Sequence, residues 1–317
     1  MRVGSKGTIM TGQILEISTD NKYVSASDGF ILVSEKEKEL ARIPIDSVEA
    51  VIVSAHGVTY SNHLLVRLSE YHIPLVICNQ KHFPVSFLLP LSGHYKQGAV
   101  MDAQAQASLS LNKSLWKDIV KAKIKMQIGV LEYFGKPVTR LDYLLKNVKS
   151  DDKENAEGQA ARVYFQMLFG TDFVRDRDAD GINAMLNYGY TILRAFVARY
   201  VVAAGLHPTL GIHHRNMLNS FRLSDDLMEP FRPLVDCVVW HLFQKGEKSL
   251  SPFVKRKLVQ IFSKNLPTSL GQTQISVAIQ NLCVSLAKVY LNEKKILDFP
   301  FPLRKKDWDE LNAGDPL

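Results

Sequence analysis

Cysteine is scarce in this chain of 317 residues, and its spacing excludes two kinds of site. The three cysteines, Cys78, Cys237 and Cys283, are odd in number and far apart, and no two are separated as in Cys-x-x-Cys. A disulfide framework needs several pairs, and a structural zinc site needs closely spaced ligands. Since all three cysteines lie among apolar residues, we expect them in the hydrophobic core.

Several other sequence features are also missing. The chain has no Gly-x-x-x-x-Gly-Lys-Ser/Thr loop for nucleotide phosphates, no His-Glu-x-x-His and no Gly-x-Ser-x-Gly. No apolar run approaches the roughly 18 residues of a membrane-spanning helix. The sequence therefore predicts a soluble cytoplasmic protein without a membrane partner.

Positive charge is concentrated in the later part of the chain. Lysine and arginine number 39 against 32 aspartates and glutamates, but the first 95 residues hold 8 basic and 9 acidic side chains. A basic balance favours a polyanionic partner such as nucleic acid, although surface charge can also serve solubility alone. The hydrophobic content of 46% is enough for a sizeable core and for two domains.

Hydrophobic periodicity predicts an α+β protein, with a small β-rich domain at 1–92, a linker at 93–110 and a larger all-α domain at 111–317. The expected strands are 13–17, 23–26, 30–33, 41–45, 50–53, 75–78 and 85–89, with one helix from 61 or 62 to 71. The expected helices of the second domain are 111–133, 139–148, 155–169, 182–204, 225–243, 252–262 and 272–291. A charged tail after Pro302 is expected to pack weakly.

Four lysines recur on the first long helix of the second domain. Lys113, Lys117, Lys121 and Lys125 are spaced by four residues, so they drift by only about 40° per step and form a basic ridge. A charge run is commonly a solvated helix face. Because the sequence offers no acid within the ridge, we interpret it as a track for a phosphate backbone.

A histidine and two carboxylates form the candidate metal site. His214 and Asp226 are 12 residues apart, and Glu157 lies upstream at the start of an Ala-rich, helix-favouring run. One imidazole and two carboxylates suit a hard divalent ion, Mg²⁺ or Mn²⁺, that acts on phosphate. Four arginines surround these residues in the sequence, and their guanidinium groups match phosphate oxygens: Arg162, Arg215, Arg222 and Arg232.

Each proposed ligand also has an ordinary structural interpretation. Glu157 could complement a helix dipole, as acids in a first helical turn often do. Asp226 precedes Glu229 by three residues, which is the spacing of a capping box. His213 and Asp225 stand beside His214 and Asp226 and could replace them as ligands.

Taken together, several motifs resemble the CRISPR-associated integrases, the metal-dependent DNA endonucleases that insert new spacers into a repeat array. The resemblance covers nearly the whole chain. It is carried by segments 74–78, 121–127, 157–165 (EGQAARVYF), 183–190, 205–214 (GLHPTLGIHH) and 226–236 (DLMEPFRPLVD).

The resemblance implies that Glu157, His214 and Asp226 are the metal ligands, and that Tyr164, Asn183 and Tyr188 support the site or contact DNA. It also implies a homodimer formed through the β domains, with two dimers bridged by the family's small partner protein. The motifs lean toward the subtype that works with a single large RNA-guided nuclease. The expected DNA substrates are an incoming prespacer and the CRISPR repeat.

The expected reaction is transesterification, in which a DNA 3′-hydroxyl attacks a phosphodiester at the edge of a repeat. Two other functions remain open on the sequence. A metal-dependent nuclease of branched or broken DNA would use the same site but would only cut. A non-enzymatic DNA-binding scaffold would work without metal.

Overall fold

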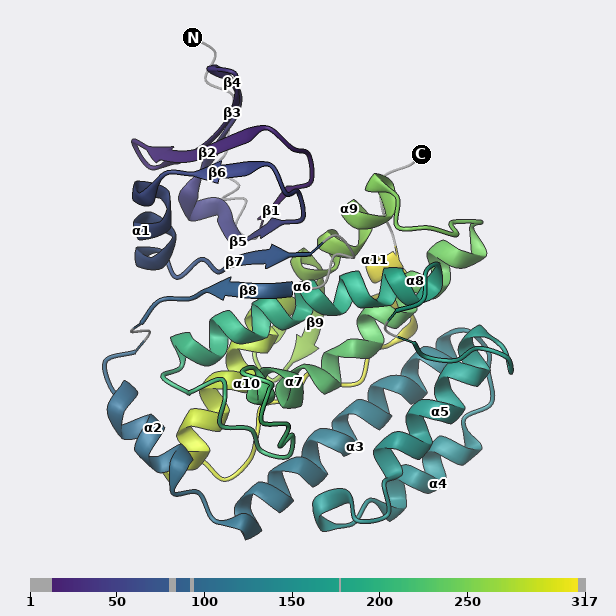
Figure 1. Ribbon diagram of the computed structural model, residues 1–317. Helices are drawn as coiled ribbons and strands as arrows, with labels where there is room; N and C mark the ends of the chain where they lie inside the picture. The colour runs from purple at the N-terminus through teal and green to yellow at the C-terminus, as the bar shows by residue number, and fades with distance from the viewer. Residues whose placement is uncertain (1–12, 80–83, 92–93, 177, 313–317) are drawn as a thin grey trace. The chain divides into compact units, whose positions relative to one another are not determined.

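The computed structural model describes residues 13–79, 84–91, 94–176 and 178–312, and it divides into two compact units, Met1–Leu91 and Ser92–Leu317 (Figure 1). The first unit is rich in strands and the second is mostly helical, as predicted. The predicted boundary residues 92 and 93 lie outside the described residues. All three cysteines are buried and none forms a disulfide, which confirms their expected place in the core.

The first unit contains two four-stranded sheets and one helix. In one sheet, parallel β1 (Gln13–Ile17), β5 (Val48–Val53) and β7 (Leu75–Cys78) are followed by antiparallel β8 (Pro84–Leu88). The other has the order β4 (Lys38–Pro44), β3 (Phe30–Glu35), β2 (Lys22–Ser27), β6 (Val58–Tyr60). The 3₁₀ helix η1 (Ile45–Ser47) precedes β5. Helix α1 (Asn62–Glu70) is capped by Ser61, which accepts a hydrogen bond from the Leu64 amide at 3.1 Å.

The second unit is built around helix α6 (Ile182–Ala203), which is apolar nearly all round and largely buried. Its neighbours α7, α8, α9 and α10 pack against it. The elements of this unit are α2 (Gln97–Ala105), α3 (Leu109–Tyr133), α4 (Thr139–Asn147), η2 (Ser150–Asp152), α5 (Ala156–Phe169), α6, α7 (Arg222–Met228), η3 (Glu229–Phe231), α8 (Arg232–Gln244), α9 (Pro252–Gln260), η4 (Ile261–Ser263), β9 (Asn265–Thr268), β10 (Gly271–Gln274), α10 (Ile275–Tyr290) and α11 (Lys305–Asn312). The antiparallel hairpin β9–β10 was not part of the helical prediction.

The segment predicted as a linker, 93–110, contains helix α2, and this part of the prediction needs correction. Its Ala and Gln residues favour helix, and Gln104 is buried although it is polar. The Gln104 amide group donates to the carbonyls of His207 at 3.1 Å and Leu210 at 2.8 Å, and its oxygen accepts the His207 amide. Helix α2 thus anchors the loop that leads to His214.

The predicted helix over 225–243 is divided into α7, η3 and α8. Pro230 and Pro233 lack the amide hydrogens that an uninterrupted helix would use, so the chain forms a 3₁₀ turn at Glu229–Phe231 and starts again at Arg232. This break determines where Glu229 and Arg232 point. Within the residues that the structure describes, no helix is both long enough and apolar enough to cross a membrane.

The tail after Pro302 does not pack weakly, as the sequence suggested, because it forms helix α11. Trp308 of this helix is only 2% exposed. Its ring lies so close to Gly129 of α3 that a Cβ atom there would be 3.3 Å from it.

We therefore expect Trp308→Ala to lower the free energy of unfolding by about 3–5 kcal/mol, because it leaves a large cavity against α3. Urea unfolding would measure this loss. Phe301→Ala is the control, since that ring is 50% exposed. If the two variants lose equal stability, the tail is peripheral after all.

Candidate active site

A buried lysine joins two carboxylates at the centre of the helical unit. Lys123 of α3 is only 6% exposed. Its Nζ contacts Oε1 of Glu157 and lies 2.5 Å from Oε2 of Glu229. The side chain of Glu229 is 5% exposed and that of Glu157 is 27% exposed. Two acids from distant parts of the chain therefore converge on one cation.

The first turn of α5 holds Glu157 in place. Asn155 accepts a hydrogen bond from the Gly158 amide at 3.1 Å, and the Asp152 carboxylate accepts the amides of Ala156 and Glu157 at 2.8 and 2.9 Å. A Cβ atom on Gly158 would lie only 2.6 Å from Oδ1 of Asn155, so a larger residue there would displace the capping side chain. The ammonium of Lys123 lowers the pKa of Glu157 although burial opposes this, and the carboxylate stays ionised.

Glu229 also contacts a second cation. Its Oε1 lies 3.2 Å from Nε of Arg232, whose guanidinium carbon sits 4.8 Å from the centre of the Tyr190 ring. Burial alone would lower the pKa values of Lys123 and Arg232, but Glu229 raises both of them. The cluster therefore consists of charged groups that depend on one another, and removing one partner would leave the others buried and unpaired.

Asp226 positions the loop that carries His214. It is fully buried, and its Oδ2 accepts the amides of Ile212 at 2.6 Å and His213 at 3.1 Å. Its Oδ1 accepts the His214 amide at 3.2 Å and lies 2.6 Å from the Nδ1 atom of the same residue. A Cβ atom on Gly211 would approach Oδ2 of Asp226 to 3.0 Å, so the close turn requires glycine. Because α7 begins at Arg222, Asp226 lies inside the helix, and the capping-box interpretation is wrong.

His214 is oriented by this contact. The hydrogen bond with Asp226 raises the pKa of His214 although burial opposes it. With Nδ1 directed at Asp226, Nε2 is the ring nitrogen left to act as a ligand, in the arrangement common for metal-binding histidines. Glu229 raises the pKa of His214, and His214 lowers that of Glu157, so these three groups interact electrostatically.

The neighbouring alternatives, His213 and Asp225, have partners of their own. The His213 ring stacks on Trp116 with centroids 4.3 Å apart, and its Nδ1 lies 3.8 Å from Asp151. Asp225 receives two hydrogen bonds from Arg194 and one from Asn219 at 2.7 Å. These contacts direct both side chains into structural roles.

The predicted ligands Glu157, His214 and Asp226 do not form a closed metal site. In the described ranges of the chain, no three His, Cys, Asp or Glu side chains are arranged so that they could hold a metal ion. The ammonium of Lys123 instead lies where a cation would meet Glu157 and Glu229. Among the described residues, none gives Glu229 Oε2 a well-oriented hydrogen bond. The carboxylates of Glu157 and Glu229, which share one cation position, and the nearby imidazole of His214 are donors of the kind that a hard divalent ion takes.

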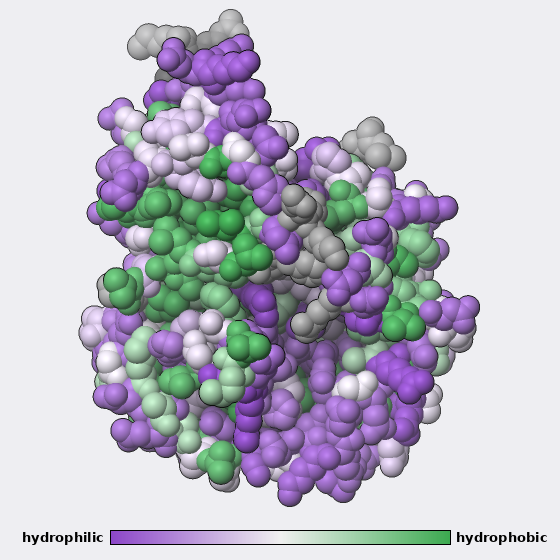
Figure 2. Space-filling view, viewed as in Figure 1, coloured by the Kyte–Doolittle hydropathy of each residue, from purple (hydrophilic) through white to green (hydrophobic). Residues whose placement is uncertain are grey.

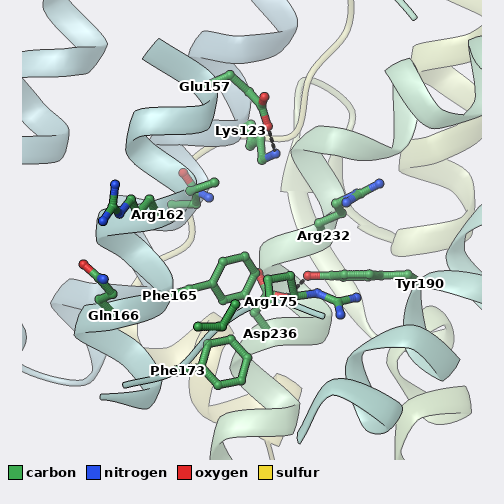
Figure 3. Close-up of a pocket in the computed structure, with 13 residues that line it drawn as sticks. Lys123, Glu157, Arg162, Phe165, Gln166, Phe173, Arg175, Tyr190, Arg232 and Asp236 are labelled. Atoms are coloured by element: carbon green, nitrogen blue, oxygen red, sulfur yellow. Dashed lines mark hydrogen bonds and ion pairs between the residues drawn. The ribbon is translucent and has the colours of Figure 1, made fainter. Parts of the chain in front are cut away.

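A cavity of about 510 Å³ opens beside this cluster. Figure 3 shows Lys123 and Glu157 at one end of it, with aromatic rings and guanidinium groups around the rest. Its lining includes Phe165, Phe173 and Val174, the arginines Arg162, Arg175 and Arg232, and Asp236. Burial raises the pKa of Asp236 to about 6, although the Tyr190 hydroxyl donates a hydrogen bond to it. The cavity is large enough for a ligand the size of a nucleotide.

The predicted basic residues take different positions. Arg162 and Arg232 line the cavity, Arg215 is exposed on the His214 loop, and Arg222 is half-buried at the start of α7. Lys117 and Lys121 are half-buried, and Lys125 is exposed. The expectation that no acid neutralises the ridge is wrong. Lys113 pairs with Asp151 at 3.4 Å, and Asp118 interacts electrostatically with Lys117, Lys121 and Lys125. Seen as in Figure 2, the surface over α4 and α5 is mostly hydrophilic.

Comparison with known proteins gives concordant matches. The family described as CRISPR associated protein Cas1 matches residues 15–266. The CRISPR-associated endonuclease Cas1 of Neisseria meningitidis is 36% identical over 87% of this chain and 92% of its own length. A casposase bound to integration product shares the fold, with a TM-score of 0.77 and 21% identity over 96% of both chains. A Cas6-RT-Cas1–Cas2 complex matches with a TM-score of 0.73 and 18% identity, over 95% of this chain and 37% of that one.

Proposed function

The chain belongs to the Cas1 family of CRISPR-associated proteins, and from this premise we propose that it is a divalent-metal-dependent DNA endonuclease and integrase of CRISPR adaptation. In this proposal a prespacer 3′-hydroxyl attacks a phosphodiester at the edge of the repeat. One observation carries the chemistry. The carboxylates of Glu157 and Glu229 converge on a single cation position, and the imidazole of His214 lies within their electrostatic reach.

We propose Glu229 as the third metal ligand, and we assign Asp226 a positioning role instead of the predicted role as a ligand. In the part of the chain that the structure describes, the hydrogen bonds of Asp226 go to the backbone and ring of the His214 loop, whereas Glu229 directs a buried oxygen toward the cation position. A bound Mg²⁺ or Mn²⁺ would polarise the scissile phosphate and stabilise the leaving oxygen. Arg162 and Arg232 would hold phosphate oxygens from the walls of the cavity.

The proposed partners follow from the family and its structural neighbours. One of those neighbours is bound to an integration product and another is a complex with Cas2, which supports DNA and a Cas2-type small protein as partners. We include in the proposal a homodimer formed through the β-rich unit. Analytical ultracentrifugation of the isolated chain would measure that assembly.

A strand-transfer assay tests the proposed function. The chain would be mixed with its Cas2-type partner, Mn²⁺, a prespacer and a plasmid that carries the repeat, and the joined products would be counted. We expect the natural chain to join the DNA, and we expect Glu157→Gln to reduce this joining by about 10³-fold. Cutting without joining would favour the nuclease of branched or broken DNA, and function that persists with a chelator would favour the scaffold.

The lysine ridge gives a separate prediction about DNA affinity. Lys121→Gln combined with Lys125→Gln should weaken DNA binding for all sequences and reduce the slope of log affinity against log salt by about 2. Fluorescence anisotropy over a range of salt concentrations would measure both effects. Lys38→Gln on exposed β4 is the control. An unchanged slope would mean that the ridge is only a solvated helix face.

A further inference from the structure

We propose that Lys123 takes two positions and thereby couples metal binding to DNA binding. In the absence of metal its ammonium neutralises Glu157 and Glu229, and when both ligands are bound it moves into the neighbouring cavity and contacts a DNA phosphate. This inference deepens the proposed function and rests on it, because it requires a divalent ion at these carboxylates.

Lys123 and a divalent ion cannot share the carboxylates. The Nζ atom contacts Glu157 Oε1 and lies 2.5 Å from Glu229 Oε2, so it stands between the two groups. An ion bound to both carboxylates would lie about 2.0–2.2 Å from their oxygens and would occupy the same space as the ammonium. Two like charges this close in a buried site repel strongly, because little water screens them. Metal binding therefore requires Lys123 to leave.

The structure provides a place for the displaced side chain. Lys123 lines the cavity of about 510 Å³, together with Gln127 one helical turn further along α3. Rotation about the four-carbon stem can turn the ammonium from the carboxylates into this space without moving the helix. Arg162 and Arg232 line the same cavity, so an ammonium that enters it needs an anion to offset the added positive charge. A DNA phosphate supplies that anion.

The consequence is reciprocal coupling. A phosphate in the cavity attracts Lys123 and so frees Glu157 and Glu229 for the metal, while the metal repels Lys123 toward the phosphate. Linkage requires each ligand to strengthen the binding of the other by the same factor. The metal site would thus bind tightly only when DNA is in place.

Mn²⁺ titration calorimetry on the full chain tests this coupling, with and without a duplex whose 3′-dideoxy overhang cannot be joined. For the natural chain, we expect DNA to tighten Mn²⁺ binding by about tenfold. Lys123→Met keeps the apolar stem and removes the competing charge, so it should bind Mn²⁺ about tenfold more tightly without DNA and respond to DNA less than about twofold. Lys146→Met, an exposed position on α4, is the matched control and should behave like the natural chain.

Further outcomes distinguish a failure of the coupling from a failure of the proposed metal site. If Lys123→Met does not fold, the titrations of the natural chain still test the coupling. An equal Mn²⁺ affinity with and without DNA would overturn it. Equal or weaker Mn²⁺ binding by a folded Lys123→Met also overturns it. Glu157→Gln should lose Mn²⁺ binding in both conditions. If it binds as the natural chain does, the proposed metal site and the coupling fall together, whereas loss in Glu157→Gln without a DNA effect overturns only the coupling.

Discussion

Glu229→Gln is expected to reduce strand transfer by about 10³-fold, as much as Glu157→Gln does. Each change replaces a charged oxygen ligand with a neutral amide and leaves the divalent ion with an incomplete set of donors. Glu229 is almost fully buried, so water has little access to the position of the lost ligand. Strand transfer at saturating Mn²⁺ and calorimetric Mn²⁺ affinity would both be measured.

Comparison with Asp226→Asn tests whether Glu229 or Asp226 is the third metal ligand. Asp226 contacts His214 and orients it, and changes to such supporting groups commonly cost about 10–100-fold in metal affinity. We therefore expect a smaller loss of affinity from Asp226→Asn than from Glu229→Gln. Glu154→Gln, an exposed acid near α5, should have no effect. If Glu229→Gln keeps full Mn²⁺ affinity while Asp226→Asn loses it, the ligands predicted from the sequence are right and the revised set is wrong.

Much of the fold was predictable because periodicity reports burial. β-Branched residues between turn formers identified every strand described in the first unit except β6, and helical spacing identified α3, α5, α6 and α10. Helix α2 was missed because the Gly, Gln, Ala and Ser content of segment 93–110 resembles a linker, although Val100 and Gln104 are buried on one side of the helix. Helix α11 was missed because its many charges conceal one buried tryptophan. Tertiary contacts determine whether such segments form helices, and amino-acid composition does not reveal those contacts.

The candidate site was only partly predictable. Glu157 and His214 belong to motifs that resemble the family, so they were selected from the sequence. Lys123 was missed because it lies outside the four-residue spacing of the lysine ridge and has no acidic residue within one helical turn of it in the sequence. A signal was available, since Lys123 and Gln127 are polar residues four apart on the face that carries Ile119.

Glu229 was assigned to a capping box because its spacing from Asp226 fits one. That interpretation assumed that a helix starts near Asp225, but α7 starts at Arg222 and ends at Met228. Glu229 follows the end of α7 directly, and its carboxylate contacts Lys123. Where a helix begins and ends decides which of two nearby acids reaches a site, and sequence predicts such boundaries poorly.

Asp226→Asn is also expected to lower the free energy of unfolding by about 2–4 kcal/mol, which is a large share of the stability of a typical domain. The carboxylate oxygens accept three backbone amides and face the Nδ1 atom of His214. An asparagine has one acceptor oxygen, and its amino group would meet backbone donors that have no other partner in the loop. Urea unfolding with a chelator present would measure the loss.

The pH dependence of that loss identifies its cause. Asp226 raises the pKa of His214 in the folded state, so this contact stabilises the protein fully below the pKa of the unfolded histidine and is lost as pH rises through the folded value. The destabilisation by Asp226→Asn should therefore be larger at about pH 5 than at about pH 9, on either side of the ordinary histidine pKa. When Asp226→Asn is introduced into a chain that already carries His214→Gln, the loss of stability that it causes should be the same at both pH values. A pH-independent loss would mean that Asp226 acts through the backbone amides alone.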